Sequence, residues 1–231
     1  MPFAHYHCLD CGRCRLTTDQ VGNMRTLPSG QKLLLTAAAL VPIVYFGAQA
    51  LAAPYFPNYS VFTTTASELG SNLSSRPSIL NTGALLTGLL ALLGSVGLAM
   101  SLPRLGADKI AAFLLAICLA SAGLAALWAG LHPLPDPRHN PGALGAGMFA
   151  SPFVALWAAW RMQSATLLRL VLSLNAIAFA VLAAIMSGAA GVDLSTIGGL
   201  VQKLLAATSF GSGAIVAGAA VWQSRQRSAL P

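Results

Sequence analysis

The segment from His132 to Gly142 holds the densest group of side chains that can carry out chemistry. It places His132, Asp136, Arg138 and His139 within eight positions. An imidazole transfers protons near neutral pH, and a carboxylate can orient it. We therefore predict His139 as a general base, Asp136 as its orienting partner and Arg138 as a ligand-binding group. A metal site formed by His132, Asp136 and His139 and a purely structural, hydrogen-bonded role stay open at this point.

A second polar group follows the first apolar stretch, in the sequence Ser67-Glu68-Leu69-Gly70. A serine hydroxyl is a nucleophile once a base removes its proton, and a carboxylate can orient that base. Ser67 and Glu68 are therefore the remaining candidate catalytic residues. The pattern between Tyr59 and Leu69 predicts an interfacial helix that carries Glu68 and ends at a left-handed Gly70.

Three further residues are candidate ligand-binding groups: Asn81, Asp193 and Lys203. Lys203 lies inside the last apolar stretch, where an unpaired ammonium is costly. We expect Asp193 or Glu68 to pair with it, or its side chain to extend to the lipid headgroups. Glu68, His139 and Lys203 are predicted to form one polar cluster that suits an anionic head group.

The N-terminal tail contains metal-ligand residue types. Cys8, Cys11 and Cys14 follow a Cys-x2-Cys-x2-Cys spacing, and His7 precedes them. Thiolates and imidazoles bind zinc, and thiolates bind iron–sulfur centres. No second cysteine pair follows, so the set is incomplete. A protein without a cofactor is the primary prediction, and a zinc or iron site in the tail is the alternative.

Six long apolar stretches must position these residues. The 231-residue chain is 56% hydrophobic and 8% charged, against about 25% charged in an average soluble domain. Each stretch is long enough to cross a bilayer as a helix, which satisfies its own backbone hydrogen bonds. The sequence thus predicts an all-α, six-helix transmembrane bundle over residues 31–224, between a tail of residues 1–30 and a short tail of residues 225–231. The predicted spans are residues 33–53, 79–102, 110–131, 141–160, 166–187 and 197–222.

The net charge of +7 predicts topology rather than a nucleic-acid partner. Ten of the 13 basic residues fall in the tails and in alternate connections, whereas Arg76 and Arg138 fall in the opposite ones. Because basic residues favour cytoplasmic loops, both termini are predicted to be cytoplasmic.

Small residues recur four positions apart, as in Ala122, Ala126 and Gly130, or Ala214 and Gly218. Such spacing lets helix backbones approach closely. We expect these faces to pack within the bundle or to form a homo-oligomer.

Four motifs together point to a known family. They are Ser67-Glu68-Leu69-Gly70, Asn81 with Gly83 and Gly88, Gly130-Leu131-His132-Pro133 before His139, and Gly199-Leu200-x-Gln202-Lys203. They resemble the bacterial and archaeal six-helix membrane family filed as domain of unknown function 998, over about residues 33–222. More distantly, the chain is similar to the Frag1/DRAM/Sfk1 type of six-span proteins, which are associated with lipid handling. The resemblance implies a multi-pass protein of the cell membrane, the inner membrane of a bacterium or archaeon. The family more often has Phe-Pro at His132-Pro133 and arginine at Lys203.

These residues and their placement are compatible with three functions. The favoured one is a membrane protein that binds a lipid or other amphipathic molecule through an outward-facing polar mouth, with membrane lipids as its partners. The second is an intramembrane hydrolase or acyltransferase that uses His139 with Asp136 or Glu68, although the sequence has no Gly-x-Ser-x-Gly or His-Glu-x-x-His motif. The third is a small transporter, which would need inverted halves with matching interrupted spans.

Overall fold

The computed structural model describes residues 27–140, 142–162 and 166–228, and within them every regular element is a helix. The six longest have the length and apolarity needed to cross a membrane, α6 doing so together with the 3-10 helix before it. The predicted all-α, six-span fold is therefore confirmed. The elements are α2 (Ser29–Ala52), η1 (Ala53–Tyr55), α3 (Ala66–Leu69), α4 (Ser78–Ser101), η2 (Pro103–Leu105), α5 (Lys109–Leu131), η3 (Gly142–Gly145), α6 (Gly147–Trp160), α7 (Thr166–Met186) and α8 (Gly198–Ser228).

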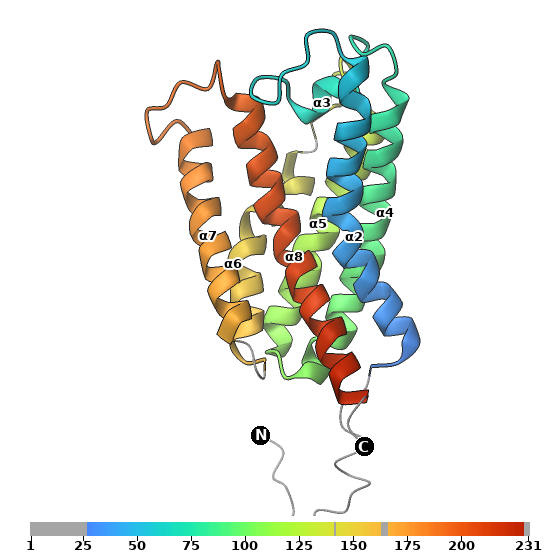
Figure 1. Cartoon of the computed structure of the whole chain (residues 1–231), viewed down its shortest axis with the longest axis vertical. Helices are drawn as coiled ribbons and strands as arrows, with labels where there is room; N and C mark the ends of the chain where they lie inside the picture. Colours follow the sequence, from blue (N-terminus) through green and yellow to red (C-terminus); the bar gives the residue numbers. More distant parts are fainter. Residues whose placement is uncertain (1–26, 141, 163–165, 229–231) are drawn as a thin grey trace, which may run out of the picture.

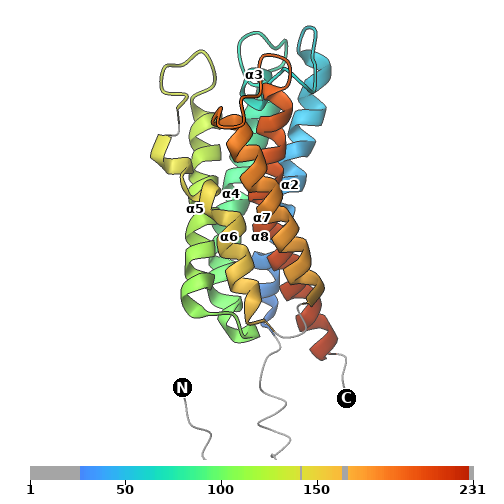
Figure 2. The same cartoon turned by 90° about the vertical axis from the view of Figure 1, so that its left-hand side faces the viewer.

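The long helices form a closed ring in which each packs against the next along the chain. The order is α2, α4, α5, α6, α7 and α8, and α8 returns to contact α2. Helix α8 also packs against α6, so that α8 lies between the α2–α4–α5 group and the α6–α7 pair (Figure 1). Short α3 and the loop of residues 132–140 lie together at one end of the bundle (Figures 1 and 2).

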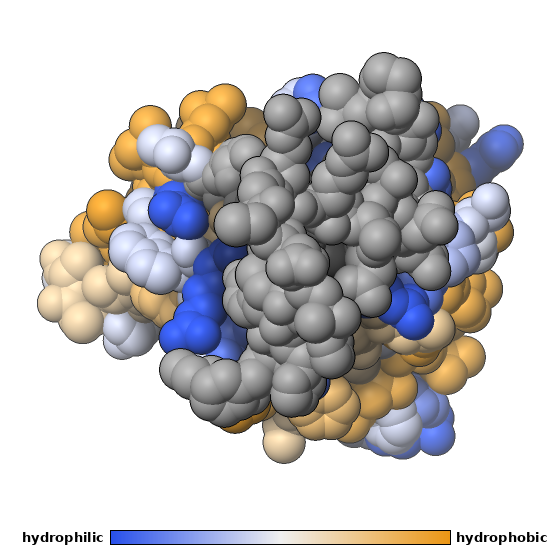
Figure 3. Space-filling model, turned by 90° about the horizontal axis from the view of Figure 1, so that it is seen from below, coloured by the Kyte–Doolittle hydropathy of each residue, from blue (hydrophilic) through white to orange (hydrophobic). Residues whose placement is uncertain are grey.

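The two ends of the described chain meet at the opposite end of the bundle. The Leu27 amide donates a hydrogen bond of 3.1 Å to Ser224 Oγ. We call the half that contains this contact the inner half and the other the outer half. The inner end carries most of the basic residues in the described part of the chain, and Figure 3 shows hydrophilic patches on it with hydrophobic residues at the periphery. These basic residues are Lys32, Arg104, Lys109, Arg161, Arg169 and Arg225. The assignment of this end to the cytoplasm stays a prediction.

Close helix contacts and large aliphatic side chains fill the inner half. A Cβ on Gly94 of α4 would lie 2.6 Å from the Cα of Ala38 on α2, so only glycine permits this approach. Gly97 meets α2 in the same way one turn further on. The surrounding apolar side chains pack against one another instead of against lipid, which gives a dense core. The largest fully buried ones are Leu35, Leu98, Leu102, Leu105, Leu115, Met162, Leu172 and Val216.

Candidate functional site

The outer half encloses a cavity of about 350 Å³. Its walls come from all six long helices, from α3 and from His139. Alanines of α5 form one wall, and aromatic and methionine side chains of α6, α7 and α8 form the inner end and the opposite side. The volume lies within the range of about 300–1,000 Å³ that is usual for small-molecule sites. The α5 wall consists of Ala122, Ala125, Ala126 and Ala129.

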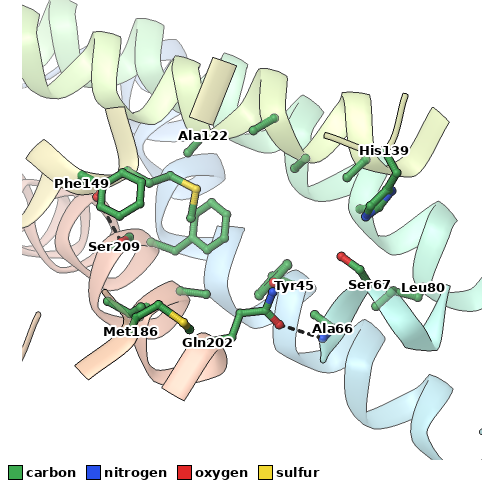
Figure 4. A pocket seen from close by; sticks show the side chains of 18 of the residues that line it. Tyr45, Ala66, Ser67, Leu80, Ala122, His139, Phe149, Met186, Gln202 and Ser209 are labelled. Carbon is green, nitrogen blue, oxygen red and sulfur yellow. Dashed lines mark hydrogen bonds between the residues drawn. The ribbon is translucent and has the colours of Figure 1, made fainter. Parts of the chain in front are cut away.

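Four of the six described polar residues that line the cavity gather at its outer end; the other two are Tyr45 and Ser209, and the Ser209 hydroxyl donates to the Met148 carbonyl oxygen at 3.1 Å. Ser67, Asn81, His139 and Gln202 all line it there. Figure 4 shows the Ser67 hydroxyl pointing into the cavity, with His139 at the same end and Gln202 across from them. An apolar cavity with a few convergent polar groups is the usual form of a binding site for a partly apolar ligand. The cavity thus joins three predicted site residues, Ser67, Asn81 and His139.

The imidazole of His139 is oriented by a main-chain oxygen. Its Nδ1 lies 2.6 Å from the carbonyl oxygen of His132. A carbonyl only accepts, so Nδ1 must carry the hydrogen, and in the neutral ring Nε2 is then an unprotonated acceptor. The surrounding loop is fixed to α5, because Trp128 Nε1 donates to the Arg138 carbonyl oxygen at 2.6 Å. His139 therefore meets the tautomer requirement for a base.

Asp136 does not supply this orientation, contrary to our prediction. Its carboxylate makes a two-point contact with Arg138, at 3.0 Å to Nε and 2.8 Å to Nη2. These hydrogen bonds lower the pKa of Asp136 and raise the pKa of Arg138. Nδ1 of His132 lies 3.5 Å from the same carboxylate. The Asp136–Arg138 pair stabilises the exposed loop, and neither Asp136 nor Arg138 lines the cavity.

Glu68 caps the helix on which it lies. Its Oε2 accepts hydrogen bonds from the Thr65 amide at 2.6 Å and the Thr65 hydroxyl at 2.7 Å, and the Thr65 side chain accepts from the Glu68 amide. This reciprocal arrangement is a capping box. The predicted interfacial helix over residues 59–69 is thereby corrected to the four residues of α3. The box holds α3 with Ser67 facing the cavity.

The interaction between Gly70 and Asn81 fixes the other end of α3. Asn81 Nδ2 donates to the Gly70 carbonyl oxygen at 3.0 Å, and a Cβ on Gly70 would collide with Asn81 Oδ1. Gly70 has φ −94°, so the predicted left-handed cap is wrong. The glycine is required instead by the close approach of the asparagine side chain. Asn81 thus joins α3 to α4 at the cavity.

Lys203 and its neighbours hold the loop of residues 61–66 against α8. The Lys203 ammonium donates to the carbonyl oxygens of Val61 and Gly199 at 3.2 Å each, and to that of Thr64. Only 8% of the residue is exposed. Gly199 lies directly against the Thr64 carbonyl oxygen, so a side chain there would prevent the contact. Gln202 Oε1 completes the attachment by accepting from the Ala66 amide at 3.1 Å.

The predicted partners of Lys203 lie elsewhere. Among the described residues the ammonium bonds to main-chain oxygens rather than to a carboxylate, although the Glu68 charge attracts it through space. Asp193 accepts from the amide and hydroxyl of Ser195 at 2.9 and 2.7 Å, which lowers the pKa of Asp193. Glu68, His139 and Lys203 bond to different partners: Glu68 to Thr65, His139 to the His132 carbonyl oxygen, and Lys203 to main-chain oxygens of the loop and of α8. The predicted anion-binding cluster is corrected to three separate contacts.

The remaining predicted sites are the metal ligands of the tail and the small-residue faces of the helices. Cys8, Cys11, Cys14 and His7 lie outside the described residues. Within the described part of the chain, His, Cys, Asp and Glu side chains form no group of three that could hold a metal. Of the small residues on α5, Ala122 and Ala126 line the cavity, whereas a Cβ on Gly130 would lie 2.9 Å from the Asn81 carbonyl oxygen on α4. The homo-oligomer stays a prediction.

Our sequence reasoning missed three polar residues of the cavity, Tyr45, Gln202 and Ser209. All three lie inside apolar stretches, where a polar side chain needs a partner within the bundle. Gln202 stands next to Lys203, and that adjacency was a usable signal. Tyr45 had no comparable signal in the sequence, because a tyrosine within a span is as suited to packing as to lining a cavity.

The fold and the cavity define a polytopic membrane protein of six helices with a ligand-sized space inside its outer half. Over residues 36–222 the chain matches the family described as "Protein of unknown function (DUF998)", and it belongs to that family. The predicted resemblance is therefore confirmed. Comparisons with curated proteins and with solved structures gave no match.

Proposed function

We propose that this protein binds an uncharged, single-chain amphipathic molecule, such as a monoacylglycerol or another neutral acyl lipid, in the cavity of its outer half. The chain of the lipid would occupy the apolar region between α5, α6, α7 and α8. Its head would meet Ser67, Asn81, His139 and Gln202. The observation that carries the proposal is this separation of an apolar interior from polar groups at one end.

The absence of charge on the cavity wall argues for a neutral head. None of the described residues that line it is Asp, Glu, Lys or Arg. The nearest candidates for binding an anion are already engaged, since Lys203 donates to three carbonyl oxygens and Arg138 to Asp136. A buried anion without a partner would be strongly disfavoured. We therefore replace the expected anionic head group with an uncharged one.

The polar end offers both donors and acceptors. Gln202 Oε1 accepts from the Ala66 amide, so the Nε2 group stays available as a donor. His139 Nε2 is an acceptor in the tautomer fixed by His132. The Ser67 hydroxyl can donate or accept a hydrogen bond. This combination suits an alcohol, ester or amide.

Filling the cavity tests the proposal. Ala126→Phe places a ring in the α5 wall, and Leu124→Phe is the matched control, because Leu124 on the same helix is 43% exposed. Purified full-length protein is mixed with 1-monooleoylglycerol, oleate or a lysophosphatidylglycerol, and binding is followed by native mass spectrometry. We expect wild type and Leu124→Phe to retain monooleoylglycerol preferentially, and Ala126→Phe to lose at least about tenfold in affinity. Equal retention by all three proteins, or a preference for either anionic lipid, would overturn the proposal.

Transport receives no specific support from the helices. In the two halves of the bundle, α2 and α6 occupy corresponding positions. The α2 helix is continuous over 24 residues, whereas α6 has 14 residues and is preceded by η3. Each of these two helices contains an internal proline, Pro42 and Pro152, and continues through it, so this described pair shows no matched interruption of the kind that inverted-repeat transporters use.

A further inference from the structure

We infer that Ser67 is an acyl-accepting nucleophile and that His139 is its general base, so that the cavity cleaves a neutral fatty acyl ester. The inference rests on the proposed function, because it needs the ester to bind first. The two side chains reach the same end of the cavity from different elements, Ser67 from α3 and His139 from the loop after α5.

The hydroxyl of Ser67 differs from those of the other serines around it. Ser71 donates to the Glu68 carbonyl oxygen, and Ser74 and Ser75 donate to that of Tyr55. These serines stabilise the loop. Ser67 makes no such bond among the described residues, although it lies partly buried on the cavity wall. Its hydroxyl is thus available to a bound molecule.

Catalysis by a serine needs a base whose orientation is fixed by a third group. The carbonyl oxygen of His132 supplies that group here, at 2.6 Å from His139 Nδ1. It holds the hydrogen on Nδ1 and leaves Nε2 to receive the serine proton. A main-chain carbonyl therefore takes the position that we had predicted for Asp136.

Stabilisation of the developing oxyanion needs a donor that is positioned before the reaction. The amide of Gln202 is held by the bond from the Ala66 amide to Oε1, and Ala66 is the residue next to Ser67. This bond fixes which end of the amide carries the hydrogens. Gln202 Nε2 is thus a donor on the cavity wall, tied to the same helix as the nucleophile.

The reaction then balances with water as the co-reactant. Ser67 Oγ forms a bond to the ester carbonyl carbon while its proton moves to His139 Nε2, and the carbonyl oxygen, now negative, accepts from Gln202 Nε2. Collapse reforms the carbonyl and breaks the bond to the alcohol oxygen, which takes the proton from His139. Water attacks the acyl serine in the same manner, and the serine oxygen regains its proton. The products are an alcohol and a fatty acid.

The chemistry of the cavity favours release of the acid. A fatty acid ionises near neutral pH, and the described lining residues include no lysine or arginine to pair with its carboxylate. The ester, which is neutral, fits the same wall without this penalty. The cavity thus holds the substrate more strongly than the ionised product.

An alkyl fluorophosphonate, which phosphonylates activated serines, tests the inference on the purified full-length protein. We expect one adduct per chain, located on Ser67 by peptide mass spectrometry and absent in Ser67→Ala. Ser75→Ala is the matched control, because its hydroxyl bonds to the Tyr55 carbonyl oxygen, and it should be labelled like wild type. His139→Gln should slow labelling by about 100-fold or more. It should also change the pH dependence of the labelling rate, which a merely structural role of His139 would leave as in wild type.

The same samples separate failure of this inference from failure of the proposed function. Release of oleate from 1-monooleoylglycerol should occur with wild type and stop with Ser67→Ala, while wild type should bind the ether analogue 1-O-oleylglycerol, which it cannot cleave. Binding without labelling or oleate release would overturn the catalytic inference and leave the binding function standing. Labelling that is equally fast in His139→Gln would overturn the role of the histidine. Absence of binding of the ether analogue to wild type, together with absence of oleate release, would overturn both proposals.

Discussion

The inner half of the bundle is densely packed, whereas the outer half encloses a cavity of about 350 Å³, although both are built from small and aliphatic residues. In the inner half, small residues face other backbones, as Gly94 faces Ala38. In the outer half, alanines such as Ala122 and Ala126 face open space. The effect of a small residue in this membrane bundle thus depends on what lies opposite it, and its spacing along the helix does not determine that.

The loops of the outer half explain how the cavity is maintained. Lys203 and Gln202 on α8 hold the segment that ends in α3, and Asn81 on α4 holds α3 itself. These bonds connect helices on opposite sides of the cavity through their loops. In the inner half, direct side-chain packing joins the helices, and polar contacts such as that between the Leu27 amide and Ser224 add to this packing. One half is therefore stabilised by its core and the other by polar contacts around an open space.

The largest expected effect comes from adding volume to the inner half. Gly94→Leu would force the Ala38 backbone and α4 apart, since even the Cβ would lie 2.6 Å from Ala38. We expect a loss of unfolding free energy of about 3 kcal/mol, at the upper end of overpacking effects. The measurement is reversible unfolding in mixed detergent micelles, followed by tryptophan fluorescence.

The matched substitution in the outer half is Ala126→Leu, which adds volume to the cavity wall. We expect no loss of stability, or a gain of about 0.5 kcal/mol, because cavity filling is commonly stabilising. If Ala126→Leu destabilised the protein as much as Gly94→Leu, the contrast between the two halves would be wrong.

The fold could be predicted from the sequence because hydropathy alone determines where spans lie. The predicted spans agree with the helices to within a few residues at most ends; the widest gaps are at the start of α6, which begins at Gly147 rather than at residue 141, and at the end of α8, which continues to Ser228 beyond the predicted residue 222. The site could be predicted only in part. Ser67 and His139 were identified from their chemistry, and the structure places both on the cavity.

Hydrogen-bond partners could not be predicted, because they depend on which main-chain groups lack a bond. Lys203 was expected to pair with a carboxylate, yet the carbonyl oxygens of Val61 and Thr64 lie beside it and accept from it. Asp136 was expected to orient His139, yet its carboxylate bonds to Arg138, which lies two residues away in the chain. The sequence shows which polar side chains are present in the outer loops, but the geometry of these loops determines which groups they bond to.

A second, smaller effect is expected from removing the ammonium that holds the outer loop. Lys203→Met leaves carbonyl oxygens of Val61, Thr64 and Gly199 without this donor. We expect a loss of about 1.5–3 kcal/mol, typical of hydrogen bonds to a charged group, with faster proteolysis between residues 56 and 65. The control is Lys109→Met, because Lys109 is exposed at the inner end. An unchanged proteolysis rate in Lys203→Met would show that the loop does not depend on this residue.

The smallest effect concerns the exposed loop beside the cavity. Arg138→Gln removes the two-point contact that lowers the pKa of Asp136, so this pKa should rise toward its ordinary value of about 3.9. In wild type the folded-state pKa is the lower one. The contact therefore stabilises the fold above about pH 3.9, and this contribution is lost as the pH falls through the folded-state pKa. Carbon-13 NMR titration of the Asp136 carboxyl should show the lower midpoint in wild type, and identical midpoints in both proteins would contradict the assignment. Binding of 1-monooleoylglycerol should be the same in wild type and Arg138→Gln, because neither Asp136 nor Arg138 lines the cavity.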